Sequence, residues 1–319
     1  MTELLKLASI DLGTNSTRLL IADCDGETTR TLDRRMAITR LGEGVDRTKR
    51  LSPEAVERTM AALRWFSEAM GRFRPAAVKA AATSVLRDCD NGEEFLDAAG
   101  GMIGCRPEIL SGEEEARLSY LGAVSDLALG PVEDAGGVFA FDIGGGSTEL
   151  MVGGREGDGL LVTSVDVGCV RMSERFLAGT DPPSRVAIGR MESHVTGELR
   201  PVLERILPAR ISRAVGLAGT VTTLSAMKQG LKEYDTEKIH HSRLTRLEVD
   251  DIYRRLASVP LEERKEVMGL EPGRADVIVG GAAVLLAVME LAGLEEIIVS
   301  EKDILDGLVL DLYRRIKSG

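Results

Sequence analysis

Short apolar runs and longer amphipathic segments alternate along the whole chain. Short runs of this kind are typical of buried strands, whereas apolar residues spaced three and four apart are typical of helices. The pattern predicts strands at residues 7–10, 18–22, 77–82, 139–143, 149–152, 160–165 and 297–300. It predicts helices from residue 52 to about 70, from residue 111 onward, and over 184–206, 247–257, 274–291 and 303–316. Such an alternation indicates an α/β fold.

One segment of the chain occurs twice. Residues 10–21 (IDLGTNSTRLLI) align without gaps on residues 141–152 (FDIGGGSTELMV), at an offset of 131 residues. Each copy has the pattern of a strand, a turn of Gly, Ser or Thr residues, and a second strand. A repeat at this spacing implies two similar α/β halves. We expect these domains at 1–124 and 125–302, with a helix at 303–319 packing back on the first and both turns facing a cleft between them.

The two turns are candidate phosphate-binding loops. Consecutive N–H groups in a turn of small residues form a concave anion site, because no bulky Cβ stands in the way. Two ordinary glycine-rich turns are the alternative, and their repetition in one chain disfavours it. The candidate residues are Gly13, Thr14, Asn15 and Ser16 in the first loop, and Gly144, Gly145, Gly146, Ser147 and Thr148 in the second.

Acidic residues flank both turns. Asp11 and Asp142 each stand at the end of a predicted strand, directly before the turn. A carboxylate at that position can reach a divalent cation that bridges phosphate oxygens. Glu149 closes the second hairpin and adds a second acid, so all three are candidate metal ligands.

A third glycine cluster lies at residues 216–224 (GLAGTVTTL). Gly219 and Thr220 stand where an apolar run gives way to a predicted helix, whose positive end can face an anion. A strand-to-helix turn without a ligand is the alternative. The chain has no G-x-x-x-x-G-K-[ST] motif, so a P-loop nucleoside triphosphatase is not supported.

Three glutamates begin the predicted helix after Ser111. Ser111 and Glu114 fit a capping box, which is the structural explanation for acids at a helix start. Glu115 is one residue further on and points about 100° away around the helix, so it is free to face a cleft.

Arg87 follows the predicted strand at 77–82 and can bind a phosphate group. A surface ion pair with Asp88 is the commoner explanation for such an arginine.

Composition narrows the class of protein. The chain has 319 residues, 3% aromatic residues and a net charge of −11, which argues against a protein that coats nucleic acid or an anionic membrane. Its four cysteines form no C-x-x-C pair, which favours a reducing compartment. The first residues are too short for a signal peptide, and the longest apolar run, 277–289, is too short for a membrane span. We therefore expect a cytoplasmic enzyme.

The basic segment at residues 30–50 and the three histidines are explained without a ligand. The basic residues between positions 30 and 50 are typical of a solvated face, although they also form the dense positive segment that a polyanion track would need. The histidines, His194, His240 and His241, show no metal-binding spacing, and the adjacent pair is typical of a polar loop.

In combination, the motifs resemble those of the exopolyphosphatase / guanosine pentaphosphate phosphohydrolase (Ppx/GppA) family, which belongs to the superfamily of actin, sugar kinases and 70-kDa heat-shock chaperones. The segments that carry the resemblance are 10–16, 82–87, 110–117, 141–149, 166–171, 216–220 and 273–281. The resemblance implies two duplicated actin-like (ribonuclease H-like) α/β domains. It is also compatible with a homodimer.

The resemblance implies roles for particular residues. Glu115 matches the family's base for the attacking water, and Arg87 matches a phosphate-contacting arginine. Asp142 and Glu149 match residues with a magnesium role, so the implied cofactor is Mg²⁺, with Mn²⁺ as a substitute and a monovalent cation as an addition. The chain ends before the helical domains of long family members and has the length of a short, two-domain member. This casts doubt on processive degradation of very long polyphosphate.

The expected function is release of terminal orthophosphate from inorganic polyphosphate by Mg-assisted attack of water. Guanosine pentaphosphate is the alternative substrate. Two other functions remain as hypotheses: a non-hydrolytic sensor of phosphate chains or nucleotides, and a kinase of the same superfamily. Glu115 argues against both.

Overall fold

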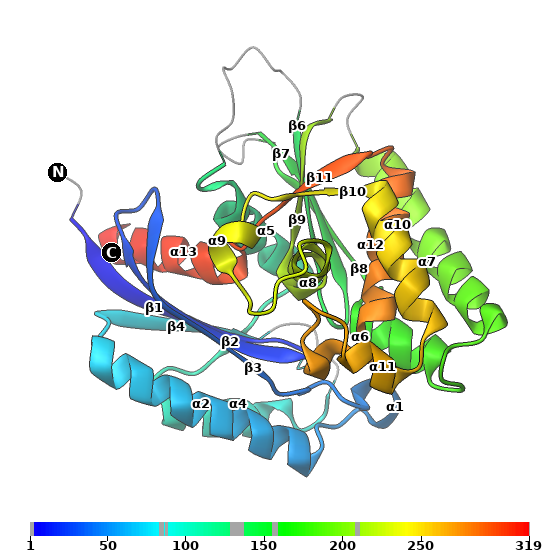
Figure 1. Cartoon of the computed structure of the whole chain (residues 1–319). Coiled ribbons are helices and arrows are strands. Elements are labelled where there is room, and N and C mark those ends of the chain that lie inside the picture. Colours follow the sequence, from blue (N-terminus) through cyan, green and yellow to red (C-terminus); the bar gives the residue numbers. More distant parts are fainter. Residues whose placement is uncertain are drawn as a thin grey trace. The chain divides into compact units, whose positions relative to one another are not determined.

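A computed structural model describes residues 3–82, 86, 89–127, 137–154, 159–207 and 211–318. The chain divides into two compact units, one of Met1–Leu127 with Lys302–Gly319 and the other of Ala128–Glu301 (Figure 1). Each unit holds one sheet, and strands and helices alternate in both as the apolar pattern predicts.

The first unit is built on a mixed sheet in the order β3-β2-β1-β4-β5. Strands β1, β2 and β3 are antiparallel neighbours, whereas β4 and β5 continue the sheet in parallel from β1. Its strands are β1 (Leu5–Leu12), β2 (Ser16–Cys24), β3 (Thr29–Ile38), β4 (Ala77–Ala82) and β5 (Glu108–Ile109). Its helices are α1 (Val45–Thr48), α2 (Pro53–Phe73), α4 (Gly92–Ile103), α5 (Gly112–Val124) and α13 (Ile304–Ser318).

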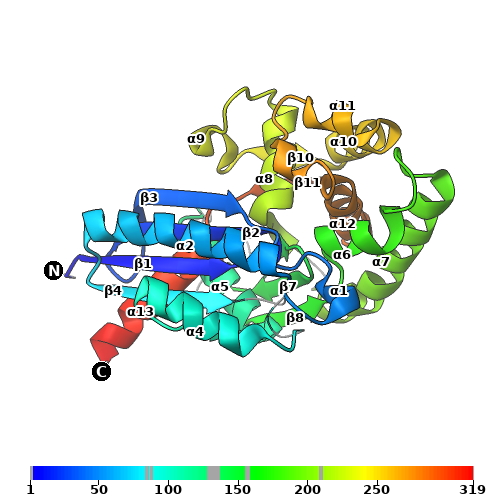
Figure 2. The ribbon, with the colours of Figure 1, turned by 90° about the horizontal axis from the view of Figure 1, so that it is seen from below.

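Helices cover both faces of this sheet (Figures 1 and 2). Successive strand residues point to opposite faces, so Ala8 and Ile10 of β1 pack under α2 and α4, whereas Leu7 packs under α13. Both faces are covered, which explains why most residues of β1 and β2 are apolar and buried. Helix α2 begins as predicted, with Ser52 capping the Ala55 amide and Pro53 at its first position, and it ends three residues later than expected, at Phe73.

The second unit repeats the same sheet order with one more edge strand. Read from β8, its sheet runs β8-β7-β6-β9-β11-β10. Its strands are β6 (Gly137–Ile143), β7 (Thr148–Gly153), β8 (Leu161–Val165), β9 (Ile211–Leu217), β10 (Arg243–Thr245) and β11 (Glu296–Val299). Its helices are α6 (Cys169–Met172), the π-helical η1 (Ser173–Leu177), α7 (Arg185–Ile206), α8 (Ala218–Lys228), α9 (Thr236–Ile239), α10 (Arg246–Ser258), α11 (Leu261–Lys265), the 3₁₀ turn η2 (Pro272–Arg274) and α12 (Ile278–Leu291).

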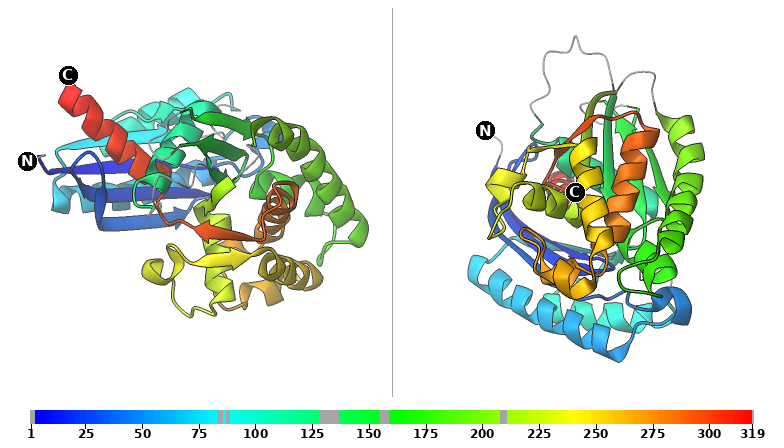
Figure 3. Two further views of the ribbon diagram at one scale, coloured as in Figure 1. Left: turned by 90° about the horizontal axis from the view of Figure 1, so that it is seen from above. Right: turned by 45° about the vertical axis from the view of Figure 1, so that its right-hand side comes forward.

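Three long helices run side by side in this unit, where α12 packs between α7 and α10 (Figure 3). Together with Phe139, Phe141 and Ile143 of β6 they form one apolar core. Alternate residues of β6 point the other way, and Asp142 is one of them. Helix α12 begins at Ile278 rather than at Arg274, because Pro272–Arg274 form a separate 3₁₀ turn.

The matching sheet orders confirm the duplication that the repeated segment predicts. In each unit a central strand pairs antiparallel with the next strand, which pairs antiparallel with a third, and pairs in parallel with a later strand on its other side. The third strands correspond as β3 and β8. In the parts of the chain that the structure covers, no helix is long and apolar enough to span a membrane.

Candidate phosphate-binding site

Both predicted loops are the turns of β-hairpins in equivalent register. In the first hairpin Asp11 pairs with Arg18 and Leu12 with Thr17; in the second, Asp142 pairs with Glu149 and Ile143 with Thr148. Each turn closes with the same bond, because the amide of its first glycine (Gly13 or Gly144) donates to the carbonyl of its serine (Ser16 or Ser147) at 3.0 Å. The two loops are therefore copies in conformation as well as in sequence.

The three glycine carbonyls of the second loop are all occupied from one side. The amide of Cys169 donates to the Gly144 carbonyl at 2.9 Å, and the amides of Val170 and Arg171 donate to the Gly145 carbonyl at 2.9 and 3.1 Å. The Gly146 carbonyl accepts from Arg171 Nε at 2.7 Å. These donors all come from the segment after β8, which thus forms a support behind the loop.

Three backbone amides of the second loop are open. Within the described ranges, the N–H groups of Gly145, Gly146 and Ser147 donate to no other residue. A row of open donors in a glycine turn is a concave anion site. The Thr148 hydroxyl, by contrast, donates to the Val167 carbonyl and so holds the loop to its support.

The first loop is supported in the same way from the segment after β3. The amides of Thr39 and Arg40 donate to the Asn15 carbonyl at 3.1 and 2.9 Å, and the amide of Gly42 donates to the Thr14 carbonyl at 2.8 Å. Asn15 is buried, and its Nδ2 donates no hydrogen bond to any residue that the structure describes. An open, buried amide donor in the loop suits an anionic ligand.

Two buried carboxylates lie beside the second loop. Asp142 is 6% exposed and Glu149 is fully buried, and they stand directly opposite each other on β6 and β7. Residues paired in this way have Cβ atoms about 5 Å apart on the same face of the sheet. Glu149 Oε1 accepts a hydrogen bond from Ser164 on β8 at 2.8 Å. Two buried acids at this separation repel each other, and a pair of carboxylates is a ligand set that suits Mg²⁺.

The first hairpin differs at the equivalent pair. Asp11 Oδ2 accepts from Arg18 Nε and Nη2 at 3.1 and 2.6 Å, and Arg18 also donates to Asp303, which precedes α13. Burial raises the pKa of the Asp11 carboxyl, the nearby Asp303 raises it further, and the ion pair with Arg18 opposes both. Asp11 Oδ1 is buried and makes no hydrogen bond to the described residues. Asp11 thus has one oxygen for a metal ion, whereas the second hairpin offers a pair of acids.

The start of α5 separates the two glutamates as the helical geometry predicts. Ser111 and Glu114 form the expected capping box: the Glu114 amide donates to Ser111 Oγ at 3.2 Å, and the Ser111 amide donates to Glu114 Oε2 at 2.9 Å. These hydrogen bonds lower the pKa of the exposed Glu114 carboxyl. Glu115 is half-buried, and its Oε2 lies out of solvent. Capping therefore accounts for Glu114 and leaves Glu115 for another role.

The third glycine cluster joins β9 to α8. The helix begins at Ala218, whose φ is +62°, and no side chain caps it. The Thr220 hydroxyl donates to the carbonyl of Ile143 at 3.3 Å, which ties this helix start to the second loop. Gly219 lies against Arg274, because a Cβ at position 219 would overlap the guanidinium group. Arg274 was not among the predicted site residues. Its only signal in the sequence was its place in residues 273–281, one of the segments that resemble the family.

Other candidates lie elsewhere or outside the described residues. The candidate Arg87 is not among the described residues. Much of the basic segment is neutralised within the first unit, where Arg30 pairs with Asp23, Arg34 with Asp306 and Arg35 with Asp33. Residues Arg47, Lys49 and Arg50 are exposed and form no ion pair with a described side chain.

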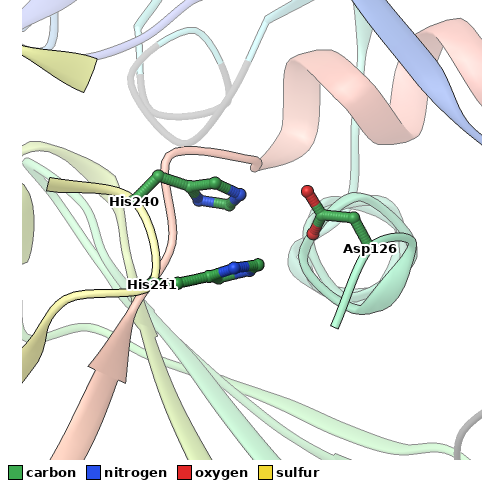
Figure 4. Close-up of side chains that lie close together, drawn as sticks. All are labelled: Asp126, His240 and His241. Carbon is green, nitrogen blue, oxygen red and sulfur yellow. The ribbon is translucent and has the colours of Figure 1, made fainter. Parts of the chain in front are cut away.

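The adjacent histidines lie in a loop of the second unit, as predicted. Their rings stack with centroids 3.8 Å apart (Figure 4). His240 Nδ1 accepts the backbone N–H of Glu301 at 3.1 Å, which fixes this ring beside the end of β11.

Two copies of one sheet order, each with a hairpin turn of small residues after its central strand, define an α/β protein of the actin-like fold. The model of the Ppx/GppA phosphatase family matches residues 20–316. The chain therefore belongs to the Ppx/GppA phosphatase family, as the sequence motifs predict, and is a hydrolase.

Full-length relatives agree with this assignment. The chain is 41% identical to "Exopolyphosphatase 2" of Mycobacterium tuberculosis over 97% of its own length and 99% of the relative's. The crystal structure of an exopolyphosphatase-like protein superposes with a TM-score of 0.91 at 34% identity, covering 99% of both chains. That of the Aquifex aeolicus family member superposes with a TM-score of 0.80 at 31% identity, also covering 99% of both.

Proposed function

We propose that this protein is an exopolyphosphatase, which releases terminal orthophosphate from inorganic polyphosphate. The observation that carries the proposal is the second hairpin, where open amides of Gly145–Ser147 stand beside the buried acids Asp142 and Glu149. The name of the mycobacterial relative, which matches nearly the whole chain, supports polyphosphate as the substrate.

The loops supply the binding energy for a terminal phosphate. Each open N–H group donates to one phosphate oxygen, and hydrogen bonds to an anion are roughly twice as strong as those between neutral groups. Asn15 Nδ2 adds a side-chain donor. Because the carbonyls are held back by the supporting segments, the donors are oriented before substrate arrives, and binding costs little reorganisation.

Asp142 and Glu149 are the proposed metal ligands of the second unit, and Asp11 Oδ1 is the candidate ligand atom of the first. When bound there, Mg²⁺, or Mn²⁺ in its place, would supply positive charge that offsets the charge of the phosphate oxygens. Ser164 fixes the orientation of Glu149 through its hydrogen bond to Oε1.

Glu115 is the proposed base. Its carboxylate accepts a proton from water as the water oxygen bonds to the terminal phosphorus. The bond from that phosphorus to the bridging oxygen breaks, and its electron pair leaves with the chain. The products are orthophosphate and a chain one phosphate shorter. The protein's contribution is then mainly positioning and charge stabilisation.

Replacing Glu115 by Gln tests this role, because the amide keeps the shape of the side chain and cannot take the proton. We expect kcat for orthophosphate release to fall by roughly 10²-fold or more, with KM little changed. Colorimetric measurement of phosphate release under substrate saturation checks this.

Glu114→Gln is the matched control, since it removes the same charge one residue away from a side chain that caps the helix. It should keep nearly all of its turnover. Near-normal turnover in Glu115→Gln would remove Glu115 from the mechanism, whereas equal losses in both variants would point to helix stability instead.

A further inference from the structure

We propose that Arg171 is a positioning residue for the second phosphate loop. It holds the peptide between Gly146 and Ser147 so that the Ser147 N–H faces the phosphate. This inference rests on the proposed function, because it assumes that the loop binds a phosphate group.

Arg171 makes a contact that no backbone group makes in its place. The Gly144 and Gly145 carbonyls are held by amides of the supporting segment, so any side chain there preserves those bonds. The Gly146 carbonyl is held at 2.7 Å by the side-chain Nε of Arg171 and, within the described chain, by no other donor.

The carbonyl of Gly146 and the N–H of Ser147 belong to one planar peptide group and point in opposite directions. Fixing the oxygen toward the support therefore fixes the N–H toward the ligand. Gly145 and Gly146 are free to adopt conformations that other residues avoid, so this peptide can turn over when the clamp is missing. A turned peptide would present an oxygen to the phosphate and withdraw a donor.

The first loop shows why the second needs a side-chain clamp. Its equivalent carbonyl, that of Asn15, accepts from two backbone amides, those of Thr39 and Arg40. Arg40 stands as far after Asp11 as Arg171 stands after Asp142. The support is thus duplicated, but at this carbonyl the first copy uses main chain and the second uses the arginine side chain.

The surroundings of Arg171 favour a role at the loop over a role at the surface. Its side chain is 17% exposed, while Asp166, at 3.8 Å, is 85% exposed. An ion pair with so exposed a partner contributes little. Gly168 brings the segment against the loop, because a Cβ at that position would overlap the Gly145 carbonyl.

Arg171→Met and Arg171→Lys test the proposal. Methionine keeps the apolar stem, and lysine keeps the charge but has a methylene where Nε lies. We expect kcat/KM for polyphosphate to fall by roughly 10²-fold in Arg171→Met, as for a misplacement of about 1 Å. We expect Arg171→Lys to lose at least about 10-fold by the same displacement. Added methylguanidinium should restore part of the Arg171→Met activity, and an equal concentration of sodium chloride should not.

Arg175→Met is the control, since Arg175 lies one turn further along and contacts His194. It should resemble the unchanged protein. Wild-type kcat/KM in Arg171→Lys, or a folded Arg171→Met that methylguanidinium does not restore, would overturn the proposal.

Calorimetric binding of tripolyphosphate gives a second readout, in which Arg171→Met should raise Kd. If the unchanged protein binds tripolyphosphate without releasing phosphate, the proposed function fails while Kd still reports on Arg171.

Discussion

At the scale of single residues, the buried pair of Asp142 and Glu149 is the feature with the greatest chemical consequence. Like charges directly opposite each other in a sheet are destabilising, and burial removes the water that would screen them. In the proposed function, a divalent cation at that position would offset the repulsion between the two buried acids. The same pair would be costly in a purely structural hairpin.

Ser164→Ala tests whether the pair binds metal. Loss of the hydroxyl frees Glu149 Oε1 from its partner on β8, and loss of such a supporting contact typically weakens metal affinity by about 10- to 100-fold. We expect the Mg²⁺ concentration for half-maximal activity to rise by about that factor, measured by titrating Mg²⁺ into metal-stripped enzyme. Ser193→Ala on α7 is the control, and an unchanged Mg²⁺ requirement in Ser164→Ala would contradict the assignment.

Site residues could be predicted from the sequence where they lie close together along the chain, within one motif. Asp142 and Glu149 flank one turn, so the hairpin pattern alone pairs them. Ser164 and Arg171 act from beyond the hairpin, and Arg171 binds a backbone carbonyl that leaves no mark in the sequence. Arg274 meets Gly219 only through folding, which is why the glycine was recognised and its partner was not.

At the scale of elements, the crossing of α5 and α13 positions the helix that carries Glu115. The two helices approach closely at glycines: a Cβ at Gly307 would overlap the Leu118 carbonyl, and a Cβ at Gly122 would overlap the Asp303 carbonyl. Helix α13 in turn packs on β1 and β2 through Leu305, Val309 and Tyr313. The C-terminal helix is therefore part of the framework behind the proposed base.

Gly307→Ala should destabilise the protein, because backbone atoms cannot move aside as a flexible side chain does. We expect a loss of about 1–3 kcal/mol in the free energy of unfolding, measured by urea denaturation. Gly101→Ala in α4 is the matched control, because the space around Gly101 is open and alanine is the better helix former by up to about 1 kcal/mol. Equal stability of Gly307→Ala and the unchanged protein would contradict the close crossing.

Sequence patterns predict the elements best where they are apolar on both faces. The strands of both hairpins were predicted because most of their residues are apolar and buried. Strand β3 was missed, because its arginines made it look like a charged surface segment. In the structure Arg34 and Arg35 are ion-paired on that strand, which reconciles their charge with a place in the sheet.

At the scale of the whole molecule, duplication explains how an acidic protein can bind a polyanion. A net charge of −11 repels phosphate at long range. In the proposed function, binding therefore relies on short-range donors, which are the open amides of the second loop and Asn15 Nδ2, together with the proposed divalent cation. Each unit carries one loop, one supporting segment after its third strand and one acid before its turn, and only the second adds the paired glutamate.

The central claim is that this protein removes terminal phosphates from polyphosphate chains. The most direct measurement is orthophosphate release by the purified protein, with Mg²⁺ and after its removal by chelation, from polyphosphates of several defined lengths and from guanosine pentaphosphate. We expect Mg²⁺-dependent release from polyphosphate with products shortened one phosphate at a time, and a higher kcat/KM than for guanosine pentaphosphate. A higher kcat/KM for guanosine pentaphosphate would contradict the choice of substrate, and binding without release from either would contradict the hydrolytic role itself.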